Sequence, residues 1–175
     1  MATGGADLIR EMARGDHDAF ARFYDRYAPL VYPLIRRILH DSGDVAACLH
    51  DVFWQSWQQA KAFDPARDTA EAWLVNRARD LAIERMRAAR RRGAGLPFGN
   101  GRARVSGEEP AERPLDRSVL SRVFERLPDP QRQALELAYY GGLTQTEITA
   151  RLKQPLGSVK TRLRLSLDRV REMVK

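Results

Sequence analysis

The sequence predicts an all-α protein made of two small helical domains that are joined by a flexible linker. Along almost every patterned segment, apolar residues recur at intervals of three and four, and no segment shows the alternation of a half-buried strand. Five glycines and three prolines gather between residues 93 and 114, which is the composition of a flexible connection. A chain of 175 residues has the length of one ordinary domain or two small ones.

The composition excludes several classes of protein. Charged residues make up 30% of the chain and hydrophobic residues 43%, which suits a folded protein rather than a disordered one. No apolar run approaches the ~20 residues that a membrane span needs, and residues 1–14 lack the apolar core of a signal peptide. The lone Cys48 excludes an intramolecular disulfide and a cysteine-based zinc site. We therefore expect a cytoplasmic protein without membrane insertion.

The distribution of charge indicates a polyanionic partner more clearly than the net charge of +7 does. Residues 73–104 contain nine arginines and two acidic residues, and residues 117–175 contain twelve basic and six acidic residues. The segments 1–72 and 105–116 are each net negative, at −3. A single basic block can be a solvated face, but two separated blocks favour a polyanion that is touched at two places.

The first domain, which we place at residues 1–92, is expected to begin its regular structure with a helix over residues 18–39. Its apolar residues recur at threes and fours along the whole segment. Pro29 and Pro33 lie inside this pattern. Each lacks a backbone donor, so each should bend or interrupt the helix.

Two more helices are predicted in the first domain. Asp44 follows a turn and is expected to cap a helix that extends to about residue 62. The residues Phe-Asp-Pro at 63–65 break the pattern. The third helix is expected to run from about Thr69 to Arg92.

The second domain, residues 116–175, follows the linker at residues 93–115 and is predicted to contain four helices. The first covers residues 116–127, and the second begins around the prolines at 128 and 130 and ends at a glycine pair. Thr144 is expected to cap a short third helix that ends at Leu152, with Glu147 in the capping-box position.

The last two helices form a predicted helix–turn–helix. A turn leads to Ser158, which is expected to cap the final helix and to leave backbone N–H groups for a phosphate. One apolar stripe is predicted to be buried, namely Val159, Leu163, Leu167 and Val170.

The residues away from that stripe suit duplex DNA. Lys160, Thr161 and Arg164 lie near the helix N-terminus, which enters the major groove in such motifs. Arg164 can donate two hydrogen bonds to O6 and N7 of a guanine. Arg162 flanks the stripe and suits a phosphate. The alternative is an ordinary solvated basic face. Eight basic against two acidic residues in the segment 151–175 favour DNA.

The helix at residues 71–92 is a second candidate nucleic-acid surface. Opposite its apolar face lies a stripe of charged residues, namely Arg77, Asp80, Glu84, Arg87 and Arg91. The two acidic residues leave open that part of the stripe is paired within the helix. Trp73 can offer a stacking surface for an unpaired base, although core packing is the ordinary alternative for a tryptophan.

The helix at residues 44–62 carries a candidate protein-binding face. Opposite its apolar residues lie Asp51, Trp54, Gln55 and Gln58. A tryptophan on a polar face indicates a protein contact, because aromatic anchors are enriched at interfaces. The alternative is that Trp54 packs across a neighbouring helix.

Signatures of catalysis are missing from the sequence. The three histidines are scattered without metal-ligand spacing, and Cys48 has no paired base. No glycine-rich segment carries the Gly-Lys-Ser/Thr of a phosphate loop. We therefore expect a protein that is not an enzyme and that uses no metal, no cofactor and no small-molecule substrate.

The motifs match a known family in their order and approximate spacing. In the first domain the matching segments are Ala19-Phe20, Phe23-Tyr24-Asp25-Arg26-Tyr27, Asp51-Val52-Phe53, Phe63-Asp64-Pro65, Trp73-Leu74, Ala78-Arg79 and Ala82-Ile83. In the second they are Leu127-Pro128, Gln131-Arg132, the run from Leu137 to Thr144, Glu147-Ile148 and the run from Pro155 to Lys160. The chain resembles the small bacterial sigma factors of the extracytoplasmic-function (ECF) type, which contain only sigma regions two and four.

The resemblance implies a transcription initiation factor that binds core RNA polymerase and directs it to specific promoters. It implies that region two melts the minus-ten element with residues Trp73, Arg77, Arg79, Asp80, Glu84 and Arg87. It implies that region two also docks on the polymerase clamp through Asp51, Trp54, Gln55 and Gln58. The helix–turn–helix would read the minus-thirty-five element through Ser158, Lys160, Thr161, Arg162 and Arg164. An anti-sigma partner that covers these faces is a further implication.

The sequence departs from the family pattern at two positions of the melting helix. Asp80 stands where the family usually has Asn, and Glu84 stands where it usually has Asp. A carboxylate accepts hydrogen bonds but does not donate them at neutral pH, so Asp80 is expected to prefer the amino group of cytosine.

Two other classes of protein stay open at this point. A two-module helix–turn–helix regulator would act on duplex DNA without polymerase, but it needs a ligand or phosphate-acceptor site that the first domain does not offer. An adaptor would bind only protein, with its arginines as solvated surface.

Overall fold

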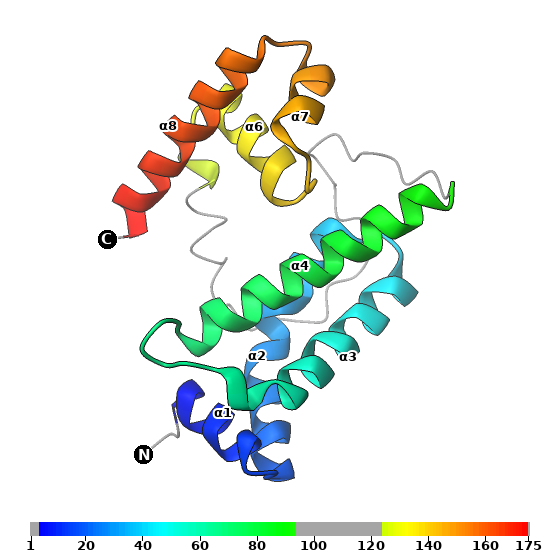
Figure 1. Ribbon diagram of the computed structural model, residues 1–175, viewed down its shortest axis with the longest axis vertical. Coiled ribbons are helices and arrows are strands. Elements are labelled where there is room, and N and C mark those ends of the chain that lie inside the picture. The colour runs from blue at the N-terminus through cyan, green and yellow to red at the C-terminus, as the bar shows by residue number, and fades with distance from the viewer. Residues whose placement is uncertain (1–3, 94–123, 175) are drawn as a thin grey trace. The chain divides into compact units, whose positions relative to one another are not determined.

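The computed structural model describes residues 4–93 and 124–174, which fall into two compact units. The first unit contains α1 (Gly5–Ala13), α2 (His17–Ile38), α3 (Ser42–Gln58), the short 3₁₀ helix η1 (Ala60–Ala62) and α4 (Ala70–Arg91) (Figure 1). The second contains α6 (Asp129–Tyr139), α7 (Gln145–Leu152) and α8 (Leu156–Val174). Every regular element of the described residues is a helix, which confirms the predicted all-α class.

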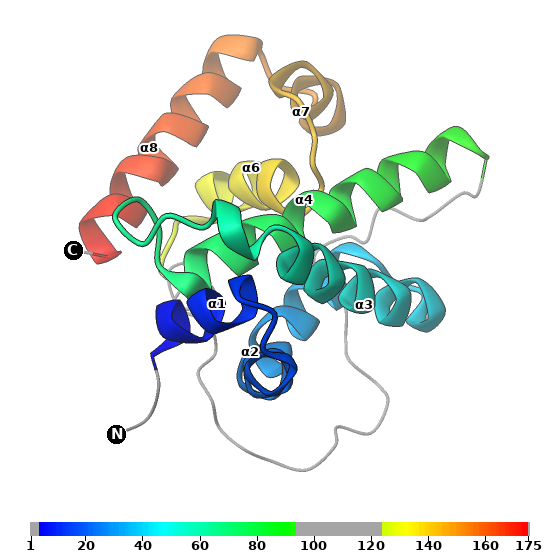
Figure 2. The ribbon, with the colours of Figure 1, turned by 60° about the horizontal axis from the view of Figure 1, so that its bottom comes forward.

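The core of the first unit lies around α2, which packs against α1, α3 and α4 (Figure 2). One face of α2 is fully buried, with residues four apart along the helix, namely Phe23, Tyr27, Val31 and Ile35. Facing residues on α3 and α4 are also buried, among them Val52, Phe53, Leu74, Ala78 and Ala82. Burial of these side chains, rather than intrinsic helix propensity, holds the helices together.

The predicted interruption of the first long helix by proline is wrong. α2 runs without a break through Pro29 and Pro33, and both prolines are exposed. The carbonyl groups that lose their helical donors therefore face solvent, where water can replace the missing N–H groups. The buried residues on both sides of the prolines keep the helix on the core.

Two helices begin slightly earlier than predicted, by one turn or less. Asp16 caps α2, because its Oδ1 accepts hydrogen bonds from the N–H groups of Asp18 (2.9 Å) and Ala19 (3.0 Å). Asp41, and not Asp44, caps α3, since its Oδ1 accepts from the N–H groups of Gly43 (2.9 Å) and Asp44 (3.1 Å). The predicted helix to residue 62 ends at Gln58, and η1 occupies residues 60–62.

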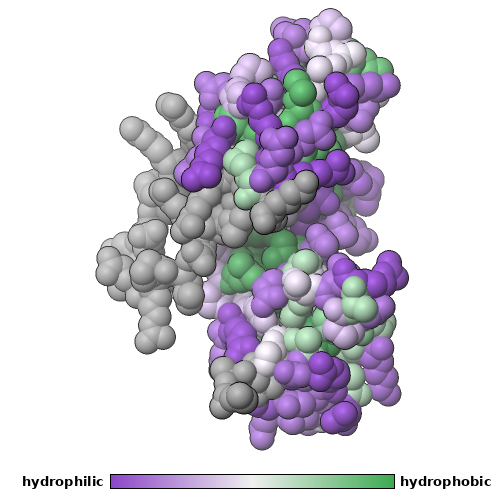
Figure 3. All heavy atoms as spheres, turned by 90° about the vertical axis from the view of Figure 1, so that its left-hand side faces the viewer, coloured by the Kyte–Doolittle hydropathy of each residue, from purple (hydrophilic) through white to green (hydrophobic). Residues whose placement is uncertain are grey.

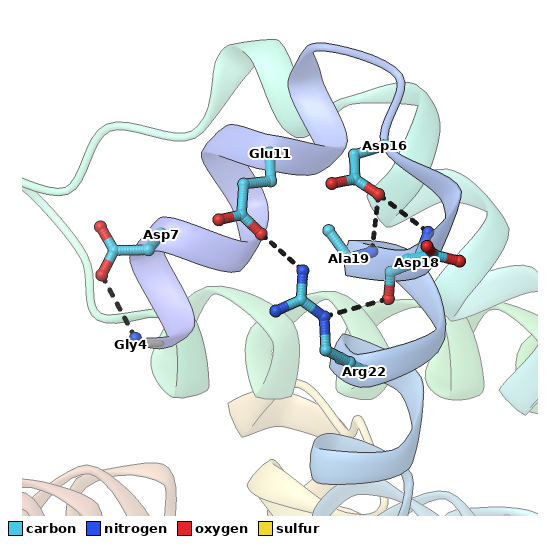
Figure 4. A network of polar contacts seen from close by, with 7 residues as sticks. All are labelled: Gly4, Asp7, Glu11, Asp16, Asp18, Ala19 and Arg22. Atoms are coloured by element: carbon cyan, nitrogen blue, oxygen red, sulfur yellow. Dashed lines mark hydrogen bonds and ion pairs between the residues drawn. The ribbon is translucent and has the colours of Figure 1, made fainter. Parts of the chain in front are cut away.

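α1 precedes the first helix predicted from the sequence. Its residues Leu8, Ile9 and Met12 are buried, and the helix contacts α2, α3, η1 and α4. Figure 4 shows a polar contact that joins it to α2, where Arg22 of α2 donates to Glu11 of α1 at 2.8 Å. Arg22 also donates to the carbonyl of Asp18 within α2, at 3.3 Å. Its small first residue, Gly5, lies so close to α2 and α4 that a Cβ there would be 2.0 Å from Tyr27 Oη.

The start of α4 is fixed by a cap and by a contact from α2. Thr69 Oγ1 accepts a hydrogen bond from the N–H of Ala72 at 3.1 Å, as the predicted start at Thr69 requires. Tyr27 Oη donates to Glu71 Oε1 at 2.7 Å, which joins the middle of α2 to the first turn of α4. Burial and this carboxylate raise the pKa of Tyr27 to about 12.

The second unit has its own core, in which α6 and α7 both pack against α8. The buried residues are Phe124, Leu127, Ala134, Leu135, Ile148, Val159 and Leu163. The predicted capping box is confirmed, since Glu147 N–H donates to Thr144 Oγ1 at 3.3 Å and Thr144 N–H donates to Glu147 Oε2 at 2.7 Å. The predicted helix at 116–127 and the linker at 93–115 lie largely outside the described residues.

The last helix differs from its prediction at two positions. α8 begins at Leu156, so Ser158 lies within the first turn and is not the cap. Leu167 is 46% exposed, whereas Ser166 is fully buried, so the buried stripe passes through Val159, Leu163 and Ser166. Ser166 can be buried because its hydroxyl donates to the carbonyl groups of Arg162 (2.7 Å) and Gln131 (3.1 Å).

Hydrophilic residues predominate on the face of the molecule shown in Figure 3. Within residues 4–93 and 124–174, no helix combines the length and the apolar character that crossing a bilayer requires.

Candidate nucleic-acid interface

Three of the five side chains expected to contact duplex DNA are exposed on α8. Lys160, Thr161 and Arg164 all lie on the solvent face of its first half. The Thr161 hydroxyl donates to the carbonyl of Gly157 at 2.9 Å, so it offers DNA an acceptor more readily than a donor. Arg162 is half-buried, with Nη2 at 3.5 Å from Gln154 Oε1, and Ser158 is half-buried as well.

Three charged residues of the predicted melting face are exposed on α4, namely Asp80, Glu84 and Arg87. Arg79 is only partly exposed and its Nη1 lies 3.1 Å from Asp80 Oδ1. This ion pair joins neighbouring residues of one helix. It offsets part of the negative charge that Asp80 brings to the surface.

A pocket of about 360 Å³ lies where the end of α3 meets the first half of α4. We call it the α3–α4 pocket, and its lining residues are Gln55, Asp68, Trp73, Asn76, Arg77, Asp80 and Leu81. One aromatic ring and several carboxylate and amide groups therefore surround a space open to solvent. This combination suits a flat, polar-edged ligand such as a nucleic-acid base.

Trp73 is half-buried at this pocket, so it combines the two roles considered for it, namely core packing and a stacking surface for a base. Phe63 meets its ring edge to face, with 5.4 Å between the ring centroids. The Arg77 guanidinium lies over the ring, with Cζ 4.6 Å from the centroid. Trp73 is thus packed against its neighbours and still lines the pocket.

Arg77 differs from the exposed arginines of the same helix. It is half-buried, its Nη1 donates to Gln59 Oε1 at 2.9 Å, and burial lowers the pKa of its guanidinium. The predicted charged stripe therefore does not form one uniform surface. Arg77 turns toward the end of α3, whereas Arg87 faces solvent.

The polar face predicted on α3 divides into two parts. Trp54 is 51% exposed and Gln58 is exposed, as a docking surface requires. Gln55 lines the α3–α4 pocket instead, and Asp51 forms an ion pair with Arg85 of α4. The structure therefore brings a residue of the expected polymerase face and residues of the expected minus-ten face into one pocket.

Cys48 is fully buried in the first unit, and burial raises the pKa of its thiol to about 11. Among the described residues, no three His, Cys, Asp or Glu side chains are grouped so that they could hold a metal ion.

Two models of sigma-factor regions match the chain. The Sigma-70 region 2 model matches residues 23–92, and the Sigma-70 region 4 model matches residues 123–172. The ECF RNA polymerase sigma factor SigK of Mycobacterium ulcerans is 36% identical over 171 residues, which cover 94% of this chain and 90% of that protein. This chain belongs to the ECF family of RNA polymerase sigma factors. ECF sigma factors are transcription initiation factors, which favours that function over the regulator and the adaptor.

Other ECF sigma factors are similar over the same length. The SigK protein of Mycolicibacterium vanbaalenii is 32% identical over 172 residues, which cover 94% of this chain and 86% of that protein. Among solved structures, Rhodobacter sphaeroides SigE in complex with the anti-sigma ChrR is 25% identical, with a TM-score of 0.49 and coverage of 97% of both chains.

Sequence reasoning missed three residues that shape the α3–α4 pocket of this ECF sigma factor. Asn76 follows Trp73 by one helical turn, so its place beside the tryptophan was available from spacing. Asp68 and Gln59 lie outside the periodic part of α4, and no pattern in the sequence connects them with it. Their position depends on how α3, η1 and the following loop lead the chain back to α4.

Proposed function

We propose that the α3–α4 pocket accepts an unpaired base of the minus-ten element while the chain is bound to core RNA polymerase. The observation that carries this proposal is the half-buried Trp73, which is surrounded by polar groups that can hydrogen-bond the edge of a base, with Asp80 at the rim. Base–aromatic stacking contributes about 1–3 kcal/mol per base, enough to favour capture of a base that promoter melting has exposed. Arg79, Glu84 and Arg87 complete the minus-ten surface on the same helix.

We assign one promoter element to each domain, because each of the two basic blocks falls mainly in one domain. Residues 1–92 are proposed to bind polymerase through Trp54 and Gln58, assisted by Asp51 and Gln55, and to melt the minus-ten element. Residues 116–175 are proposed to read the minus-thirty-five element as duplex through α8, with Arg164 on base edges and Lys160 on phosphate or base edges. Residues 93–115 connect the two as a linker.

Further parts of the proposal come from the family. The sigma factor acts in the cytoplasm and is not an enzyme, because polymerase carries out the chemistry of RNA synthesis. An anti-sigma partner is proposed to cover the exposed Trp54 face, since Rhodobacter sphaeroides SigE was solved with such a partner.

Run-off transcription tests the proposed function. Purified chain is added to core RNA polymerase with a library of promoter fragments. For each transcript, the template DNA upstream of its start site is then identified. We expect transcripts from fragments that share one minus-ten and one minus-thirty-five sequence. Trp73→Ala should lower melting, measured by permanganate reactivity of unpaired thymines, without lowering binding to polymerase.

A matched control separates docking from melting. Trp54→Ala changes an exposed tryptophan of α3 and should weaken binding to core polymerase instead. Tight binding of the chain to duplex promoter without polymerase would favour the regulator. Absence of both promoter-dependent transcription and duplex binding would favour the adaptor.

A further inference from the structure

We propose that Arg77 is a positioning residue that holds the ring of Trp73 as a wall of the α3–α4 pocket, and that it does not bind DNA phosphate. This inference rests on the proposed function of the pocket, and it changes the role that the charged stripe predicted for Arg77. Three observations support it, namely the geometry of the guanidinium, its burial and the contrast with the exposed Arg87.

The guanidinium of Arg77 is already engaged inside the protein. Its Nη1 donates to Gln59 Oε1 at 2.9 Å, and its Cζ lies 4.6 Å from the centroid of Trp73. Its Nε is buried and makes no hydrogen bond to the residues that the structure describes. A phosphate ligand would have to compete with Gln59 for a guanidinium that is half-buried and stacked on the indole ring.

The chemistry of arginine suits this position better than that of lysine. A guanidinium is planar and weakly hydrated, so it can stack on an indole ring while its edge donates to an amide. A lysine ammonium carries the same charge but is strongly hydrated and has no planar face. Arg77→Lys therefore keeps the charge and removes the stacked geometry.

Arg77 and Trp73 of α4 together contact two other segments beside the pocket. Arg77 donates to Gln59 at the end of α3 and stacks on Trp73, while Phe63 meets the Trp73 ring edge to face. The indole ring is therefore held before any ligand enters. A base that stacks on a held ring loses less binding free energy to ordering than one that stacks on a mobile ring.

The first test needs no promoter. The full chain is labelled with 5-fluorotryptophan, whose three ¹⁹F resonances are assigned with Trp→Phe variants. We expect Arg77→Lys to shift the Trp73 resonance and to increase its solvent isotope effect, while Trp54 and Trp57 serve as internal controls. Arg87→Lys should move none of the three.

The second test uses holoenzyme and a single-stranded oligonucleotide with the minus-ten sequence recovered by run-off transcription. We expect Arg77→Lys and Arg77→Gln to weaken binding alike, by about 10-fold, with an unchanged salt dependence. A phosphate contact, as expected for Arg87, behaves differently. Arg87→Lys should retain the contact, whereas Arg87→Gln should lower the slope of log affinity against log salt by about 0.7. In a Trp73→Leu background, Arg77→Lys should have no further effect.

The outcomes separate this inference from the proposed function. An unmoved Trp73 resonance in Arg77→Lys, or full binding by Arg77→Lys with a reduced slope in Arg77→Gln, would overturn the positioning role. If Arg77→Lys shifts the Trp73 resonance but wild-type holoenzyme does not bind the oligonucleotide, the pocket is overturned as a base site, while Arg77 still holds Trp73.

Discussion

Burial decides the chemistry of Cys48 at the scale of a single residue. The sequence left open whether this thiol senses redox state, because a lone cysteine needs an accessible, ionised sulfur to react. The side chain is fully buried, and the pKa of the thiol is raised to about 11. In the folded protein the thiol is therefore neutral and shielded at physiological pH.

The raised pKa of Cys48 predicts a loss of stability at alkaline pH. The unfolded chain releases this proton near pH 8.5, whereas the folded chain keeps it until about pH 11, so stability is present below about pH 8.5 and falls above it. We expect a loss of about 2 kcal/mol between pH 7 and 10 from this group. Urea unfolding of wild type and Cys48→Ala at both pH values measures how much free energy of unfolding each protein loses as the pH rises. The wild type should lose more than the variant, and equal losses would contradict the prediction.

Asp80 is the residue with the clearest predicted effect on promoter choice. Its carboxylate lies at the rim of the α3–α4 pocket and can accept a hydrogen bond from an amino group, although Arg79 shares one of its oxygens. We expect Asp80→Asn to relax a preference for cytosine by about 10-fold, the lower end of what one good base contact contributes. The measurement is run-off transcription from templates that carry each base at the captured position. An unchanged base preference in the variant would refute this role.

At the scale of an element, α8 shows how a polar residue can take a core position. The spacing of leucines predicted Leu167 in the buried stripe, but the helix turns Ser166 inward against α6. Ser166→Leu would overpack this contact and remove the hydroxyl that joins α8 to the Gln131 carbonyl of α6, so we expect a loss of about 2 kcal/mol. Leu167→Ser at the exposed neighbour should change stability by about 0.5 kcal/mol or less. Urea unfolding followed by circular dichroism compares the pair, and a larger effect at Leu167 would restore the predicted stripe.

The docking of α1 depends on the absence of a side chain at Gly5. A methyl group there would lie 2.0 Å from Tyr27 Oη and 2.7 Å from Ala70 Cβ, so Gly5→Ala must displace α1 or the start of α4. We expect a loss of about 2 kcal/mol and faster amide exchange in α1. Gly157→Ala is the control, because the same methyl group in α8 meets no atom within 4 Å. Equal unfolding midpoints for the two variants would show that α1 tolerates the group.

At the scale of the whole molecule, the arginine-rich helix α4 and the basic helix α8 lie in separate compact units. Each unit offers DNA only a few cationic contacts, so we expect the chain alone to bind promoter duplex weakly, with affinity that falls steeply as salt increases. Core polymerase, which engages the chain as well as the DNA, should raise the affinity by more than 100-fold through effective concentration. Fluorescence anisotropy at 50 and 200 mM salt, with and without polymerase, measures both effects. Tight, salt-insensitive binding by the chain alone would contradict this view.

The sequence by itself determined the helical class, the family and the position of most helices, because these follow from periodicity, capping residues and ordered motifs. Thr144 and Glu147 form the capping box that their spacing predicted, and α4 begins directly after Thr69, where its start was expected. Tertiary structure decided the features that depend on contacts between distant segments. Pro29 and Pro33 continue α2 because the core holds both of its halves, and Ser166 is buried because a carbonyl of α6 accepts its proton. Arg77 leaves the charged stripe because the packing of α3 against α4 brings Gln59 to it, which no local pattern records, whereas its contact with Trp73 follows from their i, i+4 spacing on α4.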